Sequence, residues 1–150
     1  MRVVIQRVSA ASLTVGGQPV SAIGPGMMIL VGVARGDTVG DIEWLAGKIS
    51  RLRIFDDGEG TMNLDVRQAD GEIMAVSQFT LNASTRKGNR PSYIAAAPPD
   101  EALPLYEQFV AVLSEVAGRE VRKGIFGANM QIALTNDGPV TIIMDSRIRE

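Results

Sequence analysis

The apolar positions in the first third of the chain come in short runs separated by turn residues, a pattern typical of β-strands. Arg2–Val8 is rich in β-branched residues, and Ser12–Val15 and Gln18–Ile23 flank Gly16-Gly17, a two-residue hairpin signal. Met27–Ala34 is apolar throughout, which predicts a strand buried on both faces. We therefore expect the N-terminal third to form part of a sheet.

The apolar period then changes to that of a helix. Asp37 or Thr38 can cap the start of this helix, and we expect it to end near Arg53. Its apolar stripe, spaced as on one helix face, consists of Ile42, Leu45, Ile49 and Leu52.

A second helix is predicted in the C-terminal half. Pro98-Pro99 suits its first turn: backbone N–H groups in that turn have no acceptor within the helix, and proline has no N–H to leave unpaired. Gly118 suits the position directly after its last turn. Its apolar stripe is predicted to consist of Leu105, Phe109, Val112 and Val116.

The remaining segments are predicted to be strands and turns. Further strands are expected at 63–66, 72–81, 120–126, 130–135 and 140–145. Asn136-Asp137-Gly138-Pro139 is then a turn between the last two. About eight strands and two helices in this order predict an α/β (mixed α+β) fold, in which a strongly twisted or barrel-like mixed sheet carries two helices.

Composition and charge narrow the class of protein. The length of 150 residues predicts a single domain over residues 1–150. The chain is 45% apolar and 21% charged, which is typical of a compact globule. Its net charge of −2 argues against non-specific binding to nucleic acid or membranes. No apolar stretch approaches the roughly 20 residues that span a bilayer, and no signal peptide is evident, so we expect a cytoplasmic protein without a membrane partner.

The chain contains neither cysteine nor histidine. This excludes disulfides, thiol nucleophiles, Cys/His zinc sites and every Ser-His or Cys-His triad. Asp56, Asp57 and Glu59 are the densest carboxylates, but their spacing is not that of an EF-hand, and we interpret them as a solvated turn. Phosphate-loop and nucleophile-elbow motifs are also absent from the sequence, so no metal and no cofactor is predicted.

Polar residues stand at the end of the predicted strand 72–81, in Ser77-Gln78-Phe79-Thr80-Leu81. Polar groups there are costly if they are buried without partners. An 18-residue stretch without periodicity, 82–99, follows directly, and loops of this length are often functional. Two interpretations stay open: a functional site, or hydroxyls of Ser77 and Thr80 that bond within the strand and turn.

The loop 82–99 is locally basic. Arg86, Lys87 and Arg90 give it a charge of +3, with no acidic residue to offset them. The functional interpretation is a phosphate contact, and the alternative is an ordinary solvated loop. A second segment, Gly124–Met130, carries Phe126 and Met130 in a glycine-rich turn, and it can also be a hairpin with core anchors.

These segments together resemble the D-aminoacyl-tRNA deacylase family, and the resemblance spans essentially the whole chain. The two principal motifs are Ser77-Gln78-Phe79-Thr80-Leu81 and Asn136-Asp137-Gly138-Pro139-Val140-Thr141. The other segments that look like those of the family are Met1–Val8, Lys87–Ser92 and Gly124–Met130.

The resemblance implies a homodimeric enzyme that hydrolyses the ester between a D-amino acid and the terminal ribose of tRNA and spares L-aminoacyl-tRNA. It also suggests activity on glycine mischarged onto tRNA(Ala). The expected partners are therefore such a tRNA and a second copy of the chain, and no DNA.

The resemblance also implies roles for individual residues. The catalytic wall is expected to consist of Ser77, Gln78, Phe79 and Thr80. Gly138-Pro139 is expected to contain a cis peptide bond and to reach into the partner subunit's site as the element of chiral selection. The residues expected to bind substrate or tRNA are Arg86, Lys87, Arg90, Phe126 and Met130.

Residue chemistry favours one mechanism over another. A nucleophilic Thr80 needs an activating base, and the motif contains no histidine, carboxylate or lysine. The substrate has its own vicinal ribose hydroxyl, so the protein needs mainly to position it and to stabilise the oxyanion, through backbone N–H groups near Phe79 and Thr80 or through Gln78. A non-catalytic nucleic-acid-binding dimer is the alternative function.

Overall fold

The structure is a computed structural model in which residues 1–149 are described. Within them lie eight strands, two α-helices and one short 3-10 helix. The strands are β1 (Arg2–Val15), β2 (Gln18–Ile23), β3 (Gly26–Gly32), β4 (Phe55–Asp56), β5 (Met62–Leu64), β6 (Glu72–Ser77), β7 (Val121–Lys123) and β8 (Met130–Asp145). The helices are α1 (Val39–Ile49), the 3-10 helix η1 (Phe79–Asn82) and α2 (Pro99–Ala117).

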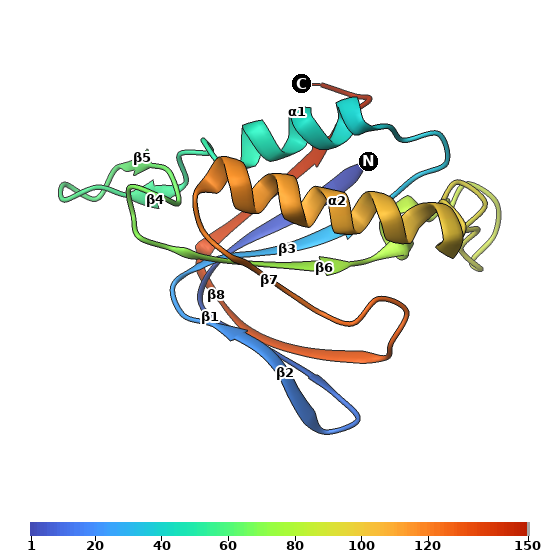
Figure 1. The fold of residues 1–150 in the computed structure, drawn as a ribbon, viewed down its shortest axis with the longest axis horizontal. Helices are drawn as coiled ribbons and strands as arrows, with labels where there is room; N and C mark the ends of the chain where they lie inside the picture. Colours follow the sequence, from blue (N-terminus) through green and yellow to red (C-terminus); the bar gives the residue numbers. More distant parts are fainter. Residues whose placement is uncertain (150) are drawn as a thin grey trace.

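Strand β1 is the centre of a six-stranded mixed sheet (Figure 1). On one edge its first half pairs with β3 and its second half with β2, and β8 runs antiparallel along the other edge. β6 lies parallel to β3, and β7 lies parallel to β6. β2 also approaches β6 and β7, so the sheet curls back on itself. This confirms the barrel-like mixed sheet that the sequence predicts; β4 and β5 form a separate hairpin.

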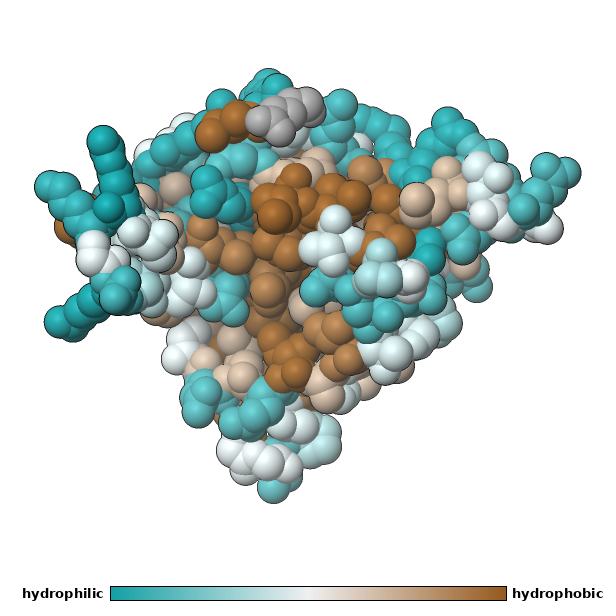
Figure 2. All heavy atoms as spheres, turned by 180° about the vertical axis from the view of Figure 1, so that it is seen from behind, coloured by the Kyte–Doolittle hydropathy of each residue, from teal (hydrophilic) through white to brown (hydrophobic). Residues whose placement is uncertain are grey.

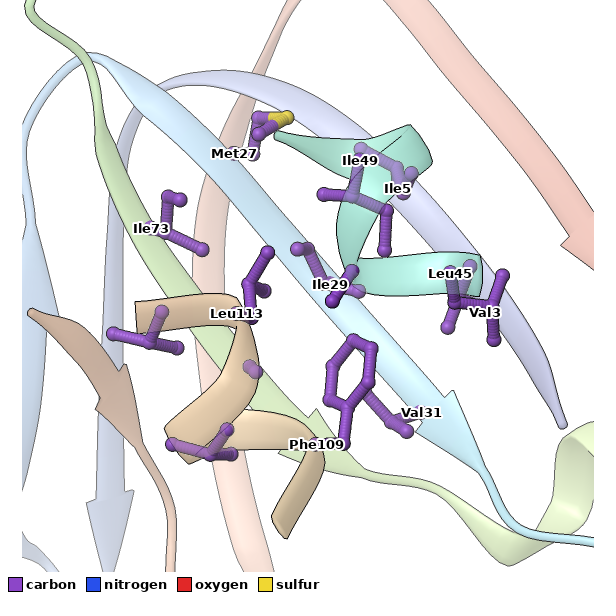
Figure 3. Close-up of a cluster of buried hydrophobic side chains, with 14 of the residues drawn as sticks. Val3, Ile5, Met27, Ile29, Val31, Leu45, Ile49, Ile73, Phe109 and Leu113 are labelled. Carbon is purple, nitrogen blue, oxygen red and sulfur yellow. The ribbon is translucent and has the colours of Figure 1, made fainter. Parts of the chain in front are cut away.

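The two α-helices lie against each other on one face of the sheet (Figure 1). Figure 3 shows the main core, in which side chains of β1, β3 and β6 point toward Leu45 and Ile49 of α1 and toward Phe109 and Leu113 of α2. β3 is buried almost throughout because helices cover one of its faces and the curled sheet covers the other, as its unbroken apolar run predicts. In the described part of the chain, no helix has the length and apolarity needed to cross a membrane.

Several predicted boundaries are correct because local chemistry decides them. Thr38 is the N-cap of α1, and its N–H and hydroxyl donate to the Asp41 carboxylate over 2.7 and 3.0 Å. α2 begins at Pro99 and ends before Gly118, which adopts a left-handed conformation with φ of 63°. The end predicted for the first helix is wrong: α1 stops at Ile49, with Ser50 as its C-cap.

The apolar stripe predicted for α2 is wrong in part. Of its four members only Phe109 is fully buried, and Val116 is 38% exposed. The buried positions are Ala102, Tyr106, Phe109, Val110, Leu113 and Ala117. The difference arises because α2 packs on the sheet and on α1 at once, which centres its buried face on Phe109 and Leu113.

The predicted strands are wrong in four places. The segments predicted at Arg2–Val8 and Ser12–Val15 are parts of one strand, β1. The strand expected over 72–81 ends at Ser77 and turns into η1, and the strand expected over 120–126 is only three residues long. The strands expected over 130–135 and 140–145 are one strand, β8, and the segment between them is not a turn that separates two strands. Long β1 provides the pairing edge that keeps β8 continuous.

Candidate active site

A cavity of about 620 Å³ opens where β3 and β6 end. These strands are parallel, so their carboxyl ends meet at the same edge of the sheet, where α/β proteins commonly bind ligands. Much of the wall is apolar, including Val31, Val33, Val76, Ala97, Ala102 and Ile132. A largely apolar hollow with a few polar groups is the usual form of a small-molecule site.

The end of β6 brings three predicted site residues to the cavity wall: Ser77, Gln78 and Phe79. The Gln78 N–H donates to the Val31 carbonyl of β3 over 2.7 Å, which fixes this segment on the neighbouring strand. The next two N–H groups, of Phe79 and Thr80, begin η1, where no carbonyl of the helix can reach them. Within residues 1–149 neither donates to any acceptor, so Phe79, which lines the cavity, has a backbone N–H without a partner.

Thr80, the fourth predicted catalytic residue, stands beside the cavity and does not line it. The Gln78 amide donates a hydrogen bond to the Thr80 hydroxyl. No carboxylate or lysine bonds to the hydroxyls of Ser77 or Thr80 among the residues that the structure describes. The contact suits Thr80 to orienting the Gln78 side chain.

Phe126, in the segment between β7 and β8, and Met130, the first residue of β8, line the same cavity. Gly124 allows this segment to approach β1, because a Cβ on Gly124 would lie 2.5 Å from the Met130 sulfur and 3.0 Å from Leu13. The Phe126 ring packs on Tyr106 of α2, with ring centroids 5.9 Å apart. The structure therefore joins the β6 end and the segment containing Phe126 and Met130 in one site.

Tyr106, in α2, stabilises the cavity wall without lining the cavity. Burial, reinforced by the negative charge of Glu107, raises the pKa of Tyr106, which keeps its hydroxyl protonated. That hydroxyl donates to the Ala75 carbonyl of β6 over 2.9 Å. Tyr106 thus connects α2 to the strand that carries Ser77.

Two groups of predicted residues do not line this cavity. Arg86, Lys87 and Arg90 are exposed on the loop between η1 and α2, which Figure 1 shows at one end of the molecule. Gly138 and Pro139 lie in β8, away from the cavity of their own chain, and the peptide bond between them is cis.

The Gly138-Pro139 segment bulges from β8 opposite Arg7. Gln6 pairs with Thr141 and Val8 with Asn136, so residues 137–140 of β8 stand opposite Arg7 alone. The buried Arg7 side chain bonds through Nε to the Asp137 carbonyl (3.3 Å) and carboxylate (3.1 Å). Through Nη1 it bonds to the Ile54 carbonyl (2.7 Å) and to Asp56 (3.2 Å). Sequence reasoning missed Arg7, since only the fold places it behind this bulge.

Arg35 is a second residue that sequence reasoning missed. It is the one charged residue among those found to line the cavity in the described part of the chain. The available signal was its position directly after the predicted strand Met27–Ala34, since residues that follow a buried parallel strand often reach a ligand.

In residues 1–149 no cluster of three or more carboxylates is arranged to hold a metal ion.

Comparisons with known proteins bear on what this site does. The model of the family described as D-Tyr-tRNA(Tyr) deacylase matches residues 4–145. The chain is 57% identical to the D-aminoacyl-tRNA deacylase of Flavobacterium johnsoniae and 59% identical to that of Porphyromonas gingivalis. Both matches cover 150 residues and 100% of each chain. The chain belongs to the D-aminoacyl-tRNA deacylase family.

Two solved structures share this fold. A protein named c-Myc DNA Unwinding Element Binding Protein is 40% identical with a TM-score of 0.91, and the match covers 97% of this chain and 98% of that one. A probable eukaryotic D-amino acid tRNA deacylase is 18% identical with a TM-score of 0.82, covering 95% and 97%, and shows a shared fold. Family membership confirms the resemblance that the two principal motifs indicate.

Proposed function

We propose that this protein hydrolyses the ester between a D-amino acid and the terminal ribose of tRNA, releasing both. As a member of the D-aminoacyl-tRNA deacylase family it is a tRNA ester hydrolase. The observation that carries the proposal for this site is the apolar cavity whose wall includes Phe79 with its free N–H. Such a cavity can hold an aminoacyl group and present a donor to the ester carbonyl.

The chemistry is assisted by the substrate. An aminoacyl ester is already activated, and its vicinal ribose hydroxyl can help to activate the attacking water. Neither Ser77 nor Thr80 has a base beside it in the described part of the chain, which argues against a covalent acyl-enzyme. The protein contributes position and stabilises the oxyanion through N–H groups at the start of η1, with Gln78 as a further donor oriented by Thr80.

The working unit of this proposal is a homodimer with two-fold symmetry. Gly138-Pro139 is exposed and serves no cavity in its own chain, so it is available to complete the site of a second copy. A row of cross-strand neighbours, Leu30, Val4 and Ile143, lies on the face of the sheet opposite the helices; Leu30 and Val4 are partly buried, and Ile143 is 69% exposed. Figure 2 shows hydrophobic residues gathered on the face opposite to that seen in Figure 1, as a dimer interface needs.

Rejection of L-aminoacyl esters requires a rigid element placed where only the L side chain would point. Gly138 has no Cβ, so its backbone can approach a substrate closely, and Arg7 and Asp137 hold the segment from behind. A device that excludes by steric clash has no effect on glycine, which has no side chain. The proposal therefore extends to glycyl-tRNA, including glycine on tRNA(Ala).

Arg86, Lys87 and Arg90 are proposed to contact tRNA phosphates outside the cavity. They are exposed on one loop, and no ion pair neutralises them within residues 1–149. Phe126 and Met130 are proposed to contact the terminal nucleoside, since they line the cavity opposite the β6 end.

The test follows ester loss from three substrates: D-aminoacyl-tRNA, its L counterpart and glycyl-tRNA. We expect rapid hydrolysis of the first and third and sparing of the second. Equal hydrolysis of D and L esters would remove the chiral assignment, and no hydrolysis of the D ester would contradict the function. Sedimentation of the same samples reports the assembly, and a monomer with full activity would exclude the dimeric site.

The alternative, a non-catalytic nucleic-acid-binding dimer, is favoured by one observation, the 40% identity to a protein whose name refers to binding DNA. The same assay separates the two functions. A non-catalytic protein would bind D-aminoacyl-tRNA without accelerating loss of its ester, whereas the proposed hydrolase turns over many esters per active site.

A further inference from the structure

Hydrogen bonds with two separate parts of the chain hold Arg35 at the cavity. Its N–H donates to the Ala95 carbonyl and its Nε to the Ile94 carbonyl, each over 3.0 Å. Its own carbonyl accepts a hydrogen bond from Arg147. The backbone and the Nε edge of the guanidinium are therefore held against the segment 94–97, while the two terminal nitrogens make no hydrogen bond within residues 1–149.

The charge of Arg35 is not neutralised by any carboxylate that the structure describes. Other arginines near strand ends are paired: Arg2 with Asp145 at 3.0 Å, and Arg147 with Asp37 at 2.7 Å. Asp37 lies two residues after Arg35, yet it accepts from Arg147 and from the Ala34 N–H. The cavity thus has one positive charge, with no counter-ion supplied by residues 1–149.

A tethered guanidinium with free terminal nitrogens suits an oxyanion, especially a phosphate, because two parallel N–H groups match two of its oxygens. If the proposed function is right, the ester lies at Ser77 and Phe79, and the nearest anionic group of the substrate is the phosphodiester on the 5′ side of the terminal nucleoside. We propose that Arg35 binds this phosphodiester. The inference rests on the proposed function and assigns to Arg35 a contact different from those of the exposed loop containing Arg86, Lys87 and Arg90.

The location of Arg35 favours a contact with the phosphodiester of the terminal nucleoside over non-specific electrostatic attraction to the RNA backbone. It lines the same cavity as Phe79 and Met130, whereas the three basic residues of the loop do not. A phosphate held here would orient the terminal ribose relative to the Phe79 N–H. Arg35 is therefore expected to recognise the first phosphate specifically, whatever the sequence of the rest of the tRNA.

The experiment compares two small substrates, the 3′-D-aminoacyl ester of adenosine and the same ester of adenosine 5′-monophosphate. The readout is the ratio of kcat/KM for the phosphorylated ester to that for the unphosphorylated one. A hydrogen-bonded charge pair predicts a ratio of about ten or more for the wild-type protein. Arg35→Gln is expected to bring the ratio close to one. Arg35→Lys is expected to give an intermediate ratio, because lysine keeps the charge but lacks the Nε tether.

Arg51→Gln is the matched control, because Arg51 is exposed, lies outside the cavity and has no ion pair among the described residues. It should leave the ratio unchanged, and melting temperatures verify that every variant is folded. Binding of the non-hydrolysable 3′-amide analogues, with and without the 5′-phosphate, gives the same ratio without turnover.

A wild-type ratio near one, or an undiminished ratio in Arg35→Gln, would overturn the assignment of Arg35. Those results are distinct from failure of the proposed function, which would show as no hydrolysis of D-aminoacyl-tRNA by the wild-type protein and would overturn both.

Discussion

Arg7 and Asp137 form an ion pair that joins the N-terminal strand to the Gly138-Pro139 segment, with Nε of Arg7 3.1 Å from Oδ2 of Asp137. The Arg7 side chain is 8% exposed, and the Asp137 carboxylate is 54% exposed. A buried cation therefore holds a protruding segment of β8 from the inside. The position of Gly138-Pro139 depends on this contact, because residues 137–140 have no pairing with β1.

Loss of the Arg7 guanidinium should destabilise the fold and disturb chiral selection together. Arg7→Gln leaves the buried Ile54 carbonyl without its donor, while the Asp56 and Asp137 carboxylates are about half exposed, so the expected cost is about 1–3 kcal/mol. Urea denaturation measures the free energy of unfolding, and hydrolysis of D and L esters measures selectivity. Arg2→Gln is the control, because the Arg2 side chain is 38% exposed where that of Arg7 is 8% exposed, and its loss is expected to cost up to about 1 kcal/mol. Equal losses of unfolding free energy and of selectivity in the two variants would contradict a special role for Arg7.

Gly138→Ala is expected to impair the site more than replacement of a glycine in open space. The φ of Gly138 is +118°, and an added Cβ would lie 2.8 Å from Cγ2 of Val140 and 3.1 Å from Arg7. Gly60→Ala controls for conformation alone, because Gly60 has φ of +79° and an added Cβ there would meet nothing within 4 Å. We expect reduced deacylation and weaker discrimination against L esters only in Gly138→Ala. Unchanged kinetics would separate this segment from the site.

Thr80 is expected to be dispensable for the chemical step. Its hydroxyl accepts from Gln78 and has no base beside it in the described chain, so Thr80→Val, which keeps the shape, should retain substantial single-turnover activity. Removal of the 2′-hydroxyl of the terminal nucleotide should abolish turnover in the wild-type protein. Mass spectrometry of the quenched reaction tests for an acyl-enzyme, and an acyl group trapped on Thr80 would establish covalent catalysis instead.

The basic loop should determine the salt dependence of tRNA binding. Replacing Arg86, Lys87 and Arg90 by alanine removes three unpaired charges from one exposed segment. Each lost phosphate contact lowers the slope of log K against log salt by about 0.7 to 0.9, so the slope should fall by roughly 2 to 3 if all three contact phosphate. Alanine at Lys48, Arg51 and Arg53 removes the same net charge elsewhere and should alter the slope less. Equal slopes in both triple variants would remove the loop from the RNA surface.

The capping box of α1 should contribute to acid sensitivity. Burial opposes the shift, but hydrogen bonds from Ser146 and Thr38 outweigh it and lower the pKa of Asp41 from 3.8 to about 2. A carboxyl with a lower pKa in the folded state stabilises the protein above about pH 4, and this contribution is lost as the pH falls toward 2. Unfolding free energies at pH 4 and pH 2 should therefore differ less in Asp41→Asn than in the wild type. Asp100→Asn, at the exposed start of α2, is the control, and an identical pH dependence in Asp41→Asn and wild type would refute the contribution.

The sequence by itself determined the features that short-range chemistry decides. The buried strand predicted at Met27–Ala34, the capping role of Thr38 and the C-terminal Gly118 follow from local pattern and backbone conformation. The structure confirms all three, with the strand running over Gly26–Gly32. The two principal motifs also identified the family. Of the predicted wall, Ser77, Gln78 and Phe79 line the cavity because they end a strand that lies parallel to its neighbour.

Only the tertiary structure decided which distant groups face one another. Asn136–Pro139 has the local pattern of a turn, yet pairing with the 14-residue β1 makes it a bulge within one strand. Arg7 and Arg35 look alike in sequence, as single arginines next to apolar runs. The fold surrounds Arg7 with two carboxylates and leaves Arg35 facing a cavity with none among the described residues. Whether a charge is neutralised depends on neighbours far along the chain, and local sequence carries no record of them.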